Sequence, residues 1–422
     1  MKIAIIGSGG REHAICKKIC ESKKINKLFC IPGNGGTKKL AKNVDIDIKN
    51  FNSIKSFLEK EKIDITVVGP EEPLVNGITD YLVKNKFKVF GPDQFCSKLE
   101  GSKIFTKKIC EIENIPTANF KIFANKISSF EYLKNRTYPL VVKADGLAAG
   151  KGVYICENFL EAEKAVNEIF DGKFGEAKEL LVEDFLSGEE MSFFIIYDNN
   201  AFKIFNTAQD HKRIFEGDTG KNTGGMGAYS PSRLYDKKLE KKIIQKIILP
   251  TLNYLKKNNG NYVGFLYAGL MIKDNEPYLI EYNVRMGDPE CQTILPLLNN
   301  DFLEIIENCV NGTLENIDLN WKNQKSICIV LTSKGYPDKF SKNILIDNLE
   351  NLVEETNKYI FHAGTQLIDK NYYSTGGRVL NFVCLDKDFK KAREECLNLI
   401  KKLDWKNGHY RRDIGFKVIE SK

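Results

Sequence analysis

A glycine-rich segment flanked by lysines has the residue types needed to bind phosphate. Residues 141–152 read VVKADGLAAGKG, so Lys143 follows an apolar β-branched pair and small residues come next. Glycine tolerates positive φ and lets backbone N–H groups approach an anion closely. Lys143 and Lys151 would supply the positive charge that a polyphosphate requires. Because Gly152 stands where a P-loop has Ser or Thr, the segment predicts a nucleotide site of another kind or an ordinary hairpin turn.

A second segment carries oxygen ligands at the spacing of a β-strand. Residues 277–290 read PYLIEYNVRMGDPE, and alternate strand residues share a face, so Glu281, Asn283 and Arg285 would point the same way. The opposite set, expected to face the core, is Tyr278, Ile280 and Tyr282. Carboxylate and amide oxygens suit Mg²⁺, and Arg285 would neutralise a transferring phosphoryl group. A solvated edge strand would explain the alternation but not the GDPE turn, so we favour a metal site.

Composition and length describe a globular protein without the marks of nucleic-acid binding. The chain has 422 residues, of which 42% are hydrophobic and 28% charged, and this length allows several domains. The net charge of +7 is spread along the sequence, so we expect no nucleic-acid partner. No apolar run is long enough to span a bilayer, and the N-terminus lacks a signal cleavage site; we expect no membrane association and a cytoplasmic location. The 11 cysteines form no CxxC pairs and are expected to be reduced.

The first 100 residues alternate apolar strand patterns with helical patterns. The strand patterns lie at 2–6, 27–31, 65–69 and 88–91, and the helical patterns between them at 12–22 and 53–62. This alternation predicts a parallel, doubly wound sheet. The first turn reads GSGGREH, but Glu12 replaces the third glycine of a dinucleotide fingerprint, so we expect no nicotinamide cofactor. Gly9, Gly10 and Arg11 at a helix start could bind a phosphate or another anion.

The remaining sequence predicts two further parts. A helix beginning near Lys103 precedes a small α/β segment at about 115–187, which carries the glycine-rich loop. A long helix at about 237–257 and the strand with Glu281 follow. Beyond them, short strands and one amphipathic helix indicate a compact α+β cap. The expected domains of this mixed α/β and α+β chain are 1–100, 101–324 and 325–422.

These motifs together resemble the ATP-grasp superfamily and, within it, the phosphoribosylamine–glycine ligase family. The landmarks, which cover nearly the whole chain, are GSGGREH at 7–13, PGNGGT at 32–37, VGPEEPLVNG at 68–77, LEGSKIFTK at 99–107, KADGLAAGKGV at 143–153, QDHKRIFEGDTGKNTGGMGAYSP at 209–231, GFLYAGLMI at 264–272, IEYNVRMGDPE at 280–290, FHAGT at 361–365 and STGGRVL at 374–380. The resemblance implies a Rossmann-like N-terminal domain, an ATP-grasp domain and a small α+β cap. It also implies a reaction, in which ATP phosphorylates glycine and the amine of 5-phosphoribosylamine attacks the acyl phosphate. Glycinamide ribonucleotide, ADP and phosphate are the products, in a step of purine biosynthesis.

The resemblance also implies roles for individual residues. ATP binding falls to Lys103, Lys143, Gly146, Gly150, Lys151, Gly152, Glu183, Phe185, Leu186 and Glu190. Metal binding, by Mg²⁺ or Mn²⁺, falls to Glu281 and Asn283. The implied catalytic residues are Arg285, Lys143, Asp210, His211 and Lys212. Substrate contacts are implied for Gly9, Gly10, Arg11, Asn34, Glu71, Thr223, Gly224, Gly225, Arg285, Gly287, Asp288 and Pro289.

Two other functions stay open from the sequence. A related ATP-grasp ligase would use formate or bicarbonate in place of glycine, and a nucleotide-binding sensor would bind ATP without turnover. The sensor is disfavoured because no charged residue of the implied site has been lost. Glu71 is either a helix N-terminal acid or a substrate ligand. We expect ATP and Mg²⁺ or Mn²⁺ as cofactors, glycine and 5-phosphoribosylamine as substrates, and a monomer.

Overall fold

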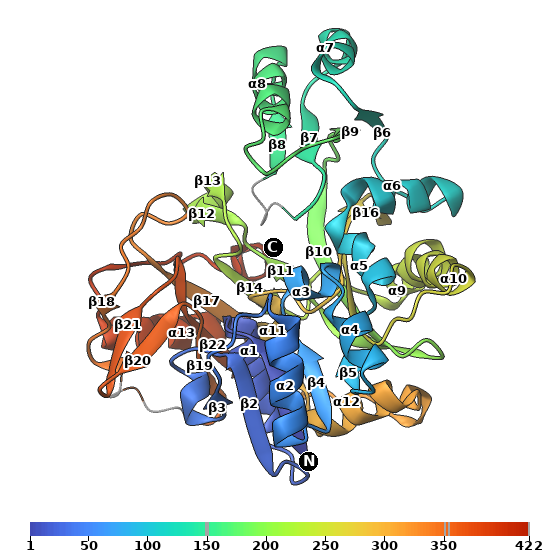
Figure 1. Ribbon diagram of the computed structural model, residues 1–422. Coiled ribbons are helices and arrows are strands. Elements are labelled where there is room, and N and C mark those ends of the chain that lie inside the picture. The colour runs from blue at the N-terminus through green and yellow to red at the C-terminus, as the bar shows by residue number, and fades with distance from the viewer. Residues whose placement is uncertain (148–151, 350–351, 353–354, 421–422) are drawn as a thin grey trace.

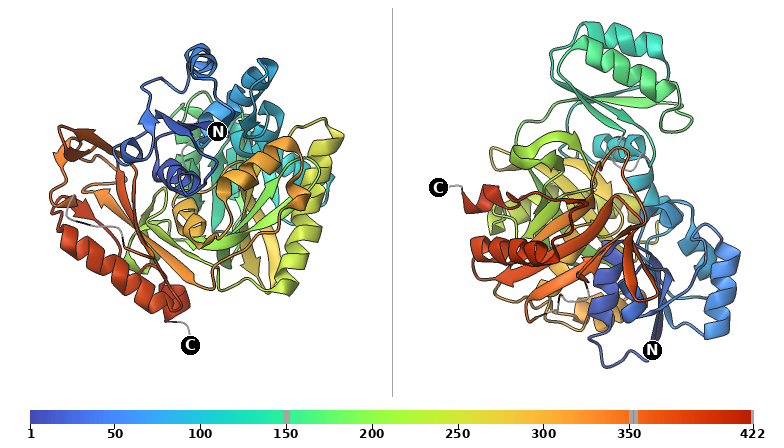
Figure 2. Two further views of the ribbon diagram at one scale, coloured as in Figure 1. Left: turned by 90° about the horizontal axis from the view of Figure 1, so that it is seen from below. Right: turned by 90° about the vertical axis from the view of Figure 1, so that its left-hand side faces the viewer.

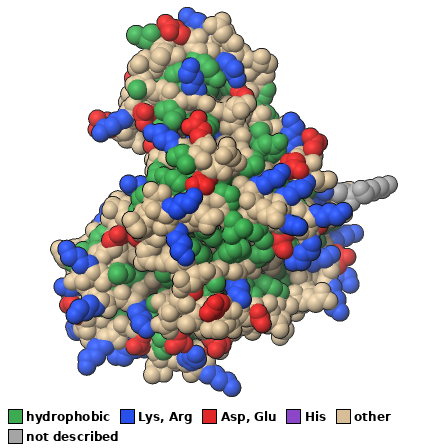
Figure 3. Space-filling model, turned by 90° about the vertical axis from the view of Figure 1, so that its right-hand side faces the viewer, with side chains coloured by type: hydrophobic (Ala, Val, Ile, Leu, Met, Phe, Trp, Pro, Cys, Tyr) green, Lys and Arg blue, Asp and Glu red, His purple; other side chains and the backbone are tan. Residues whose placement is uncertain are grey.

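The computed structural model describes residues 1–147, 152–349, 352 and 355–420 (Figure 1). Two of the predicted residues, Gly150 and Lys151, lie outside the described residues. The N-terminal and C-terminal parts lie side by side in a broad body, and a smaller lobe projects from it (Figures 1 and 2). Acidic and basic side chains are interspersed over the face shown in Figure 3. Among the described residues, no helix is long and apolar enough to cross a membrane.

The N-terminal part is a parallel five-stranded sheet in the order β3-β2-β1-β4-β5. Its strands are β1 (Lys2–Gly7), β2 (Lys27–Pro32), β3 (Lys42–Asn43), β4 (Ile65–Val68) and β5 (Val89–Phe90). Its helices are α1 (Gly10–Ile19), α2 (Phe51–Glu61), α3 (Glu71–Val75), α4 (Ile78–Lys84) and α5 (Gln94–Gly101), with a short turn η1 (Thr37–Lys39). The predicted parallel, doubly wound sheet is therefore confirmed. Helix α1 starts at Gly10, earlier than expected, because Glu12 folds back to accept the Gly9 amide at 2.6 Å and caps the helix.

The projecting lobe has a sheet and a core of its own. Helix α6 (Lys103–Ile112) leads into it, and its antiparallel strands run in the order β6-β9-β7-β8. They are β6 (Phe120–Phe123), β7 (Leu140–Ala144), β8 (Val153–Cys156) and β9 (Leu180–Asp184), packed with α7 (Lys126–Lys134) and α8 (Phe159–Phe170). Lys143 of β7 pairs with Val153 of β8, so the glycine-rich segment connects two antiparallel neighbours. The hairpin topology is compatible with phosphate binding.

One nine-stranded sheet runs through the rest of the chain, along the path β16-β15-β10-β11-β14-β17-β22-β19 with β23 beside β17. Its strands are β10 (Glu189–Tyr197), β11 (Phe202–Asp210), β14 (Gly227–Ser230), β15 (Gly264–Lys273), β16 (Glu276–Asn283), β17 (Lys325–Ser333), β19 (Lys358–His362), β22 (Arg378–Asp386) and β23 (Gly408–His409). The hairpin β12 (Arg213–Phe215) and β13 (Thr219–Asn222) and the small sheet β18 (Ile344–Leu345), β20 (Thr365–Ile368) and β21 (Asn371–Ser374) lie outside it. Because β14 pairs with β17, the sheet continues across residue 325, where the sequence predicts the start of the C-terminal domain.

Helices and short turns cover this large sheet. They are η2 (Glu216–Asp218), α9 (Lys237–Ile243), η3 (Ile244–Ile248), α10 (Leu249–Lys257), α11 (Glu290–Ile294), η4 (Leu295–Leu297), α12 (Phe302–Asn311), η5 (Leu314–Asn316), α13 (Phe389–Leu403) and α14 (Phe416–Ile419). The expected long helix at about 237–257 is the run from α9 through η3 to α10. The predicted apolar stripe of the C-terminal helix is buried in α13, which packs on β17 and β22.

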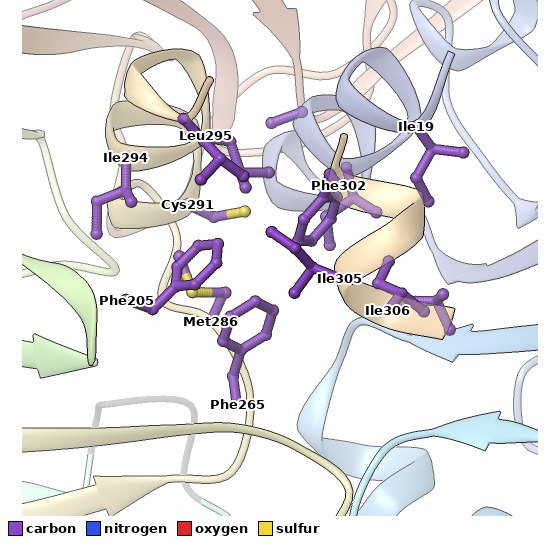
Figure 4. Close-up of a cluster of buried hydrophobic side chains, with 14 of the residues drawn as sticks. Ile19, Phe205, Phe265, Met286, Cys291, Ile294, Leu295, Phe302, Ile305 and Ile306 are labelled. Carbon is purple, nitrogen blue, oxygen red and sulfur yellow. The ribbon is translucent and has the colours of Figure 1, made fainter. Parts of the chain in front are cut away.

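A shared hydrophobic core joins the N-terminal sheet to the large sheet. Figure 4 shows Phe205 and Phe265 from the large sheet facing Met286 and Phe302, with Ile19 of α1 nearby. Burial of each such side chain contributes roughly 1.5–3 kcal/mol. Met286 is 2% exposed, so this core fixes the chain just after β16, where Arg285 and the GDPE turn are found.

A β-bulge in β16 changes the predicted inward and outward pattern. Gly269 pairs with Glu281 but Leu270 pairs with Leu279, which leaves Ile280 without a partner. A bulge adds one residue to one strand and shifts the alternation beyond it. The expected burial is confirmed for Tyr282 but is wrong for Tyr278 and Ile280, which are half-buried. Ile280 instead lines a cavity beside Glu281.

Candidate active site

A cavity of about 590 Å³ lies where the lobe, the N-terminal loops and the large sheet meet. Residues from far apart in the sequence form its wall, including most of those predicted for the site. The predicted residues that line it are Gly9, Arg11, Glu71, Lys103, Lys143, Gly146, Gly152, Glu183, Phe185, Leu186, Glu190, Asp210, Lys212, Thr223, Gly224, Glu281, Asn283, Arg285, Gly287 and Asp288. The structure thus brings the two chemically suggestive segments together in one cavity.

On the lobe side, a buried carboxylate holds two lysines. Glu183 of β9 forms ion pairs with Lys143 of β7 at 2.8 Å and with Lys107 of α6 at 3.2 Å, and all three side chains are buried. Burial would raise the pKa of Glu183, but the charges of Lys143 and Lys107 outweigh it and lower that pKa. Lys143 is therefore held at the cavity wall in a fixed position. Lys107 was not predicted, although it follows Lys103 by one helical turn and that spacing could have indicated it.

The first residues of the glycine-rich segment are tied to the start of α6. Ser102 caps α6, and its hydroxyl and the Ile104 amide both bond the Asp145 carboxylate, at 3.0 and 3.2 Å. Lys103 Nζ donates to the Gly146 carbonyl at 3.0 Å. Gly146 has φ +95°, a conformation that side chains disfavour. Burial lowers the pKa of Lys103, while the charge of Glu281 opposes that effect. These contacts place both predicted ATP lysines at one end of the cavity.

The end of β16 carries the predicted metal ligands. Glu281 and Asn283 come from the end of β16 and line the cavity together. Within the described part of the chain, no group of three or more His, Cys, Asp and Glu forms a metal cage. One carboxylate and one amide oxygen fit a hard cation that takes its other ligands from water and substrate phosphates.

Arg285 stands between two carboxylates. Its Nε donates to Glu71 at 3.1 Å, one terminal nitrogen donates to Glu100, and the other donates to the Met286 carbonyl at 3.3 Å. The charge of Arg285 lowers the pKa of Glu71 to about 2, whereas burial raises the pKa of Glu100 to about 7. Glu71 is a first-turn acid of α3 and also part of the cavity wall, so its position is compatible with both predicted roles. Glu100 was not predicted, although it stands inside the LEGSK landmark.

The far end of the cavity is rich in charged groups. Lys212 pairs with Glu190, and burial raises the pKa of Asp210 to about 7. Asp288 accepts the Arg11 backbone amide at 3.1 Å and pairs with Arg378 at 3.1 Å. Arg378 lines the cavity but was not predicted, although it lies in the STGGRVL landmark.

Five predicted residues are described but lie outside the cavity lining: Gly10, Asn34, His211, Gly225 and Pro289. Asn34 bonds the backbone of Ser8 and His362, at 2.9 and 2.8 Å. His211 is 1% exposed and bonds Asp218 and the Gly415 amide.

Comparison with known proteins agrees with this geometry. Three family models match, namely "Phosphoribosylglycinamide synthetase, N domain" over residues 1–100, the "ATP-grasp (A) domain" of the same synthetase over 101–291, and its "C domain" over 326–417. A relative from Fusobacterium nucleatum, named phosphoribosylamine–glycine ligase, is 42% identical over 418 residues and covers 98% of both chains.

Solved structures show the same likeness. The crystal structure of phosphoribosylamine–glycine ligase from Thermotoga maritima has a TM-score of 0.86 at 32% identity, covering 98% of this chain and 100% of that chain. A biotin carboxylase from Campylobacter jejuni shares the fold alone, with a TM-score of 0.74 at 18% identity, covering 100% of this chain and 95% of that chain. The predicted family resemblance and the predicted fold class are confirmed.

Proposed function

The chain belongs to the phosphoribosylglycinamide synthetase family, and we propose that it ligates glycine to 5-phosphoribosylamine with conversion of ATP to ADP and phosphate. The product is glycinamide ribonucleotide, in the purine biosynthetic pathway. One observation carries the proposal. Two lysines and the Glu281, Asn283 and Arg285 set face one cavity, in a chain 42% identical to a named ligase.

The proposed chemistry needs two anions to meet in a water-poor site. A glycine carboxylate oxygen attacks the γ-phosphorus of ATP, ADP leaves, and a glycyl phosphate forms. The amine of 5-phosphoribosylamine then attacks the acyl carbon, phosphate leaves, and the nitrogen loses a proton. Positioning and charge neutralisation supply most of the catalysis in such phosphoryl transfers. A closed cavity would also protect the acyl phosphate from water.

Each wall of the cavity has a part in this proposal. Lys103 and Lys143 would hold the ATP phosphates, with Glu183, Phe185, Leu186 and Glu190 near the adenosine. Glu281 and Asn283 would hold Mg²⁺ or Mn²⁺, which when bound screens phosphate charge. Arg285 would stabilise the transferred phosphoryl group.

The acceptor side is proposed from the remaining wall. The residues concerned are Asp210, Lys212, Thr223, Gly224, Gly287 and Asp288 near glycine and the amine, with Gly9, Arg11 and Glu71 near the ribose phosphate. The buried Gly10, Asn34, Gly225 and Pro289 would act by shaping these loops. Gly146 and Gly152 would approach the phosphates, together with Gly150 and Lys151 of the same loop.

Three further statements are proposals about the molecule as a whole. We propose domains at 1–100, 101–324 with a lobe at about 115–187, and 325–422; the separate core of the lobe and the matched family ranges support this division. We also propose a monomer. We propose a cytoplasmic location as well, because all the proposed substrates are small soluble metabolites.

The test is ADP release with ATP, Mg²⁺, glycine and 5-phosphoribosylamine generated in situ, leaving out each component in turn. We expect release only when all four are present, with a product of the mass of glycinamide ribonucleotide. Release that ignores glycine but responds to formate or bicarbonate would replace this function with that of a sister ligase. ATP binding without release would indicate a sensor.

A further inference from the structure

A segment near the end of the chain contacts a hairpin whose base lines the cavity. Residues 409–417, which we call the C-terminal clasp, begin at the last residue of β23 and lie against the hairpin of β12 and β13, whose place near the C-terminus is seen in Figure 1. His409 Nε2 lies 3.1 Å from the Ile214 carbonyl, and the Arg412 amide donates to Glu216 at 3.2 Å. The sequence does not indicate that these two segments are in contact, because about 200 residues separate them.

Arg411 and Asp218 form the centre of this contact. The Arg411 side chain is 0% exposed, and one terminal nitrogen donates to Asp218 at 2.7 Å and to the Arg213 carbonyl at 3.0 Å. Its other nitrogens donate to Asp413, which also accepts the Gly217 amide at 2.8 Å. A buried guanidinium is tolerated only when its donors are satisfied, so this network fixes the hairpin tip.

His211 extends the same network toward the cavity. The Gly415 amide donates to His211 Nε2 at 3.0 Å, so Nε2 carries no proton and the ring proton sits on Nδ1. Nδ1 lies 3.3 Å from Asp218, which also accepts Lys417 at 2.6 Å. The histidine of the QDH motif therefore connects Asp218 to the clasp and lies outside the cavity lining.

The base of the hairpin carries cavity residues. Lys212 and Thr223 face each other across it, because the Thr223 amide and hydroxyl both donate to the Lys212 carbonyl at 2.8 Å. Gly224 follows, and Lys212, Thr223 and Gly224 line the cavity. Residues 210–225, here called the acceptor segment, are thus held at the tip by Asp218 and open into the cavity at the base.

We infer that Asp218 and Arg411 are positioning residues that set the place of the acceptor segment. This inference rests on the proposed function, in which that segment contacts glycine and the amine. A tip that is no longer held lets Lys212, Thr223 and Gly224 move relative to Lys103 of α6 and Lys143 of β7, which are held separately by the Gly146 carbonyl and by Glu183. Small displacements of this kind are expected to lower the reaction rate and the affinity for glycine and 5-phosphoribosylamine, but not the affinity for ATP.

The experiment compares Asp218→Asn, Arg411→Lys and Arg412→Ala in the full chain. Asp218→Asn keeps one acceptor oxygen but removes the charge, whereas Arg411→Lys keeps the charge but cannot bridge both carboxylates and the Arg213 carbonyl. We expect both to raise KM for 5-phosphoribosylamine about tenfold or more, with KM for ATP within about twofold. Hydrogen exchange of amides 213–222 should accelerate in both. Arg412 is the matched control, because its exposed side chain neighbours Arg411 and its variant should behave as wild type.

The outcomes separate the inference from the function on which it rests. Wild-type protein without glycine-dependent ADP release would reject the proposed function itself. Active wild type, with variants of lowered melting temperature but unchanged KM for 5-phosphoribosylamine, would reject positioning and leave a purely structural clasp. Since Arg411 is buried and its variant could fail to fold, Asp218→Asn, at a side chain that is 24% exposed, decides the matter alone.

Discussion

At the residue scale, the strongest assignment to test is Glu281 as a metal ligand. Replacing Glu281 by Gln keeps the shape of the side chain but removes the anionic oxygen that a hard cation prefers. We expect kcat to fall by at least about a hundredfold, equivalent to roughly 2.7 kcal/mol of transition-state stabilisation. The Mg²⁺ concentration that gives half-maximal rate should rise. Steady-state ADP release over a series of Mg²⁺ concentrations measures both effects.

Glu276 provides the matched control on the same strand. It lies at the other end of β16, where it pairs with Lys242 and Lys246 at the surface. Exposed ion pairs stabilise a protein little, so Glu276→Gln should retain wild-type kinetics and nearly wild-type stability. Equal Mg²⁺ dependence in Glu281→Gln and Glu276→Gln would remove Glu281 from the metal site.

Residue types and spacing, together with the family resemblance, predicted the cavity residues that come in contiguous motifs. The partners that hold those residues were missed, because a salt bridge depends on tertiary proximity. Glu100 meets Arg285 across 185 positions, and nothing in either local sequence requires that contact. The reverse holds for His211. Its motif is close to the site, but its ring accepts a hydrogen bond from the C-terminal clasp.

At the element scale, the turn that follows β7 can be tested through its glycine. Gly146 has φ +95°, and an added Cβ would meet no described atom within 4 Å, so Gly146→Ala adds backbone strain without a clash. Such strain is worth about 1–2 kcal/mol. The Gly146 carbonyl accepts from Lys103, and relaxing the turn would move that lysine's partner. We expect KM for ATP to rise about fivefold to tenfold in steady-state kinetics.

Gly175 provides a control, because its φ is also positive. It has φ +99°, also with no described atom within 4 Å of an added Cβ, but it does not line the cavity. Gly175→Ala should lower the melting temperature to a similar extent while ATP kinetics stay normal. If ATP kinetics are normal in both variants, the turn is only a connection between β7 and β8.

Strands and helices with a clear apolar pattern were predictable from the sequence, whereas local irregularities within them were not. The apolar runs of β1, β2 and β4 and the stripe of α13 follow from burial on one or both faces. The bulge at Ile280 does not, because alternation in β16 reads equally well with or without an extra residue. The continuity of the large sheet through β14 and β17 also depends on pairing between distant segments.

At the scale of the whole molecule, two histidines join the N-terminal part to the C-terminal part. The His362 amide donates to His13 Nδ1 at 2.8 Å, and the His362 carbonyl accepts Asn34 at 2.8 Å. Burial lowers the pKa of both imidazoles, that of His362 to about 3. Nδ1 of His13 must stay unprotonated to accept its bond, so this junction requires neutral rings.

The direction of the pH effect follows from these lowered pKa values. Above about pH 6.5 both rings are neutral in the folded and unfolded chain, and they cause no pH dependence. Below that pH the unfolded chain binds protons that the folded chain does not bind, so the free energy of unfolding falls as pH drops toward 3. Each histidine contributes a slope of about 1.4 kcal/mol per pH unit in this window.

His362→Gln removes the contribution of His362, because glutamine does not titrate. Asp210 and Glu100, whose raised pKa values near 7 act in the opposite direction, are common to both proteins and cancel in the comparison. We expect the free energy of unfolding, measured with urea between pH 6 and 4.5, to fall less steeply in the variant by about 1.4 kcal/mol per pH unit. Parallel curves would mean that His362 gains its proton without loss of the folded junction. A shallower curve would show that the folded chain keeps His362 neutral where its N-terminal and C-terminal parts meet.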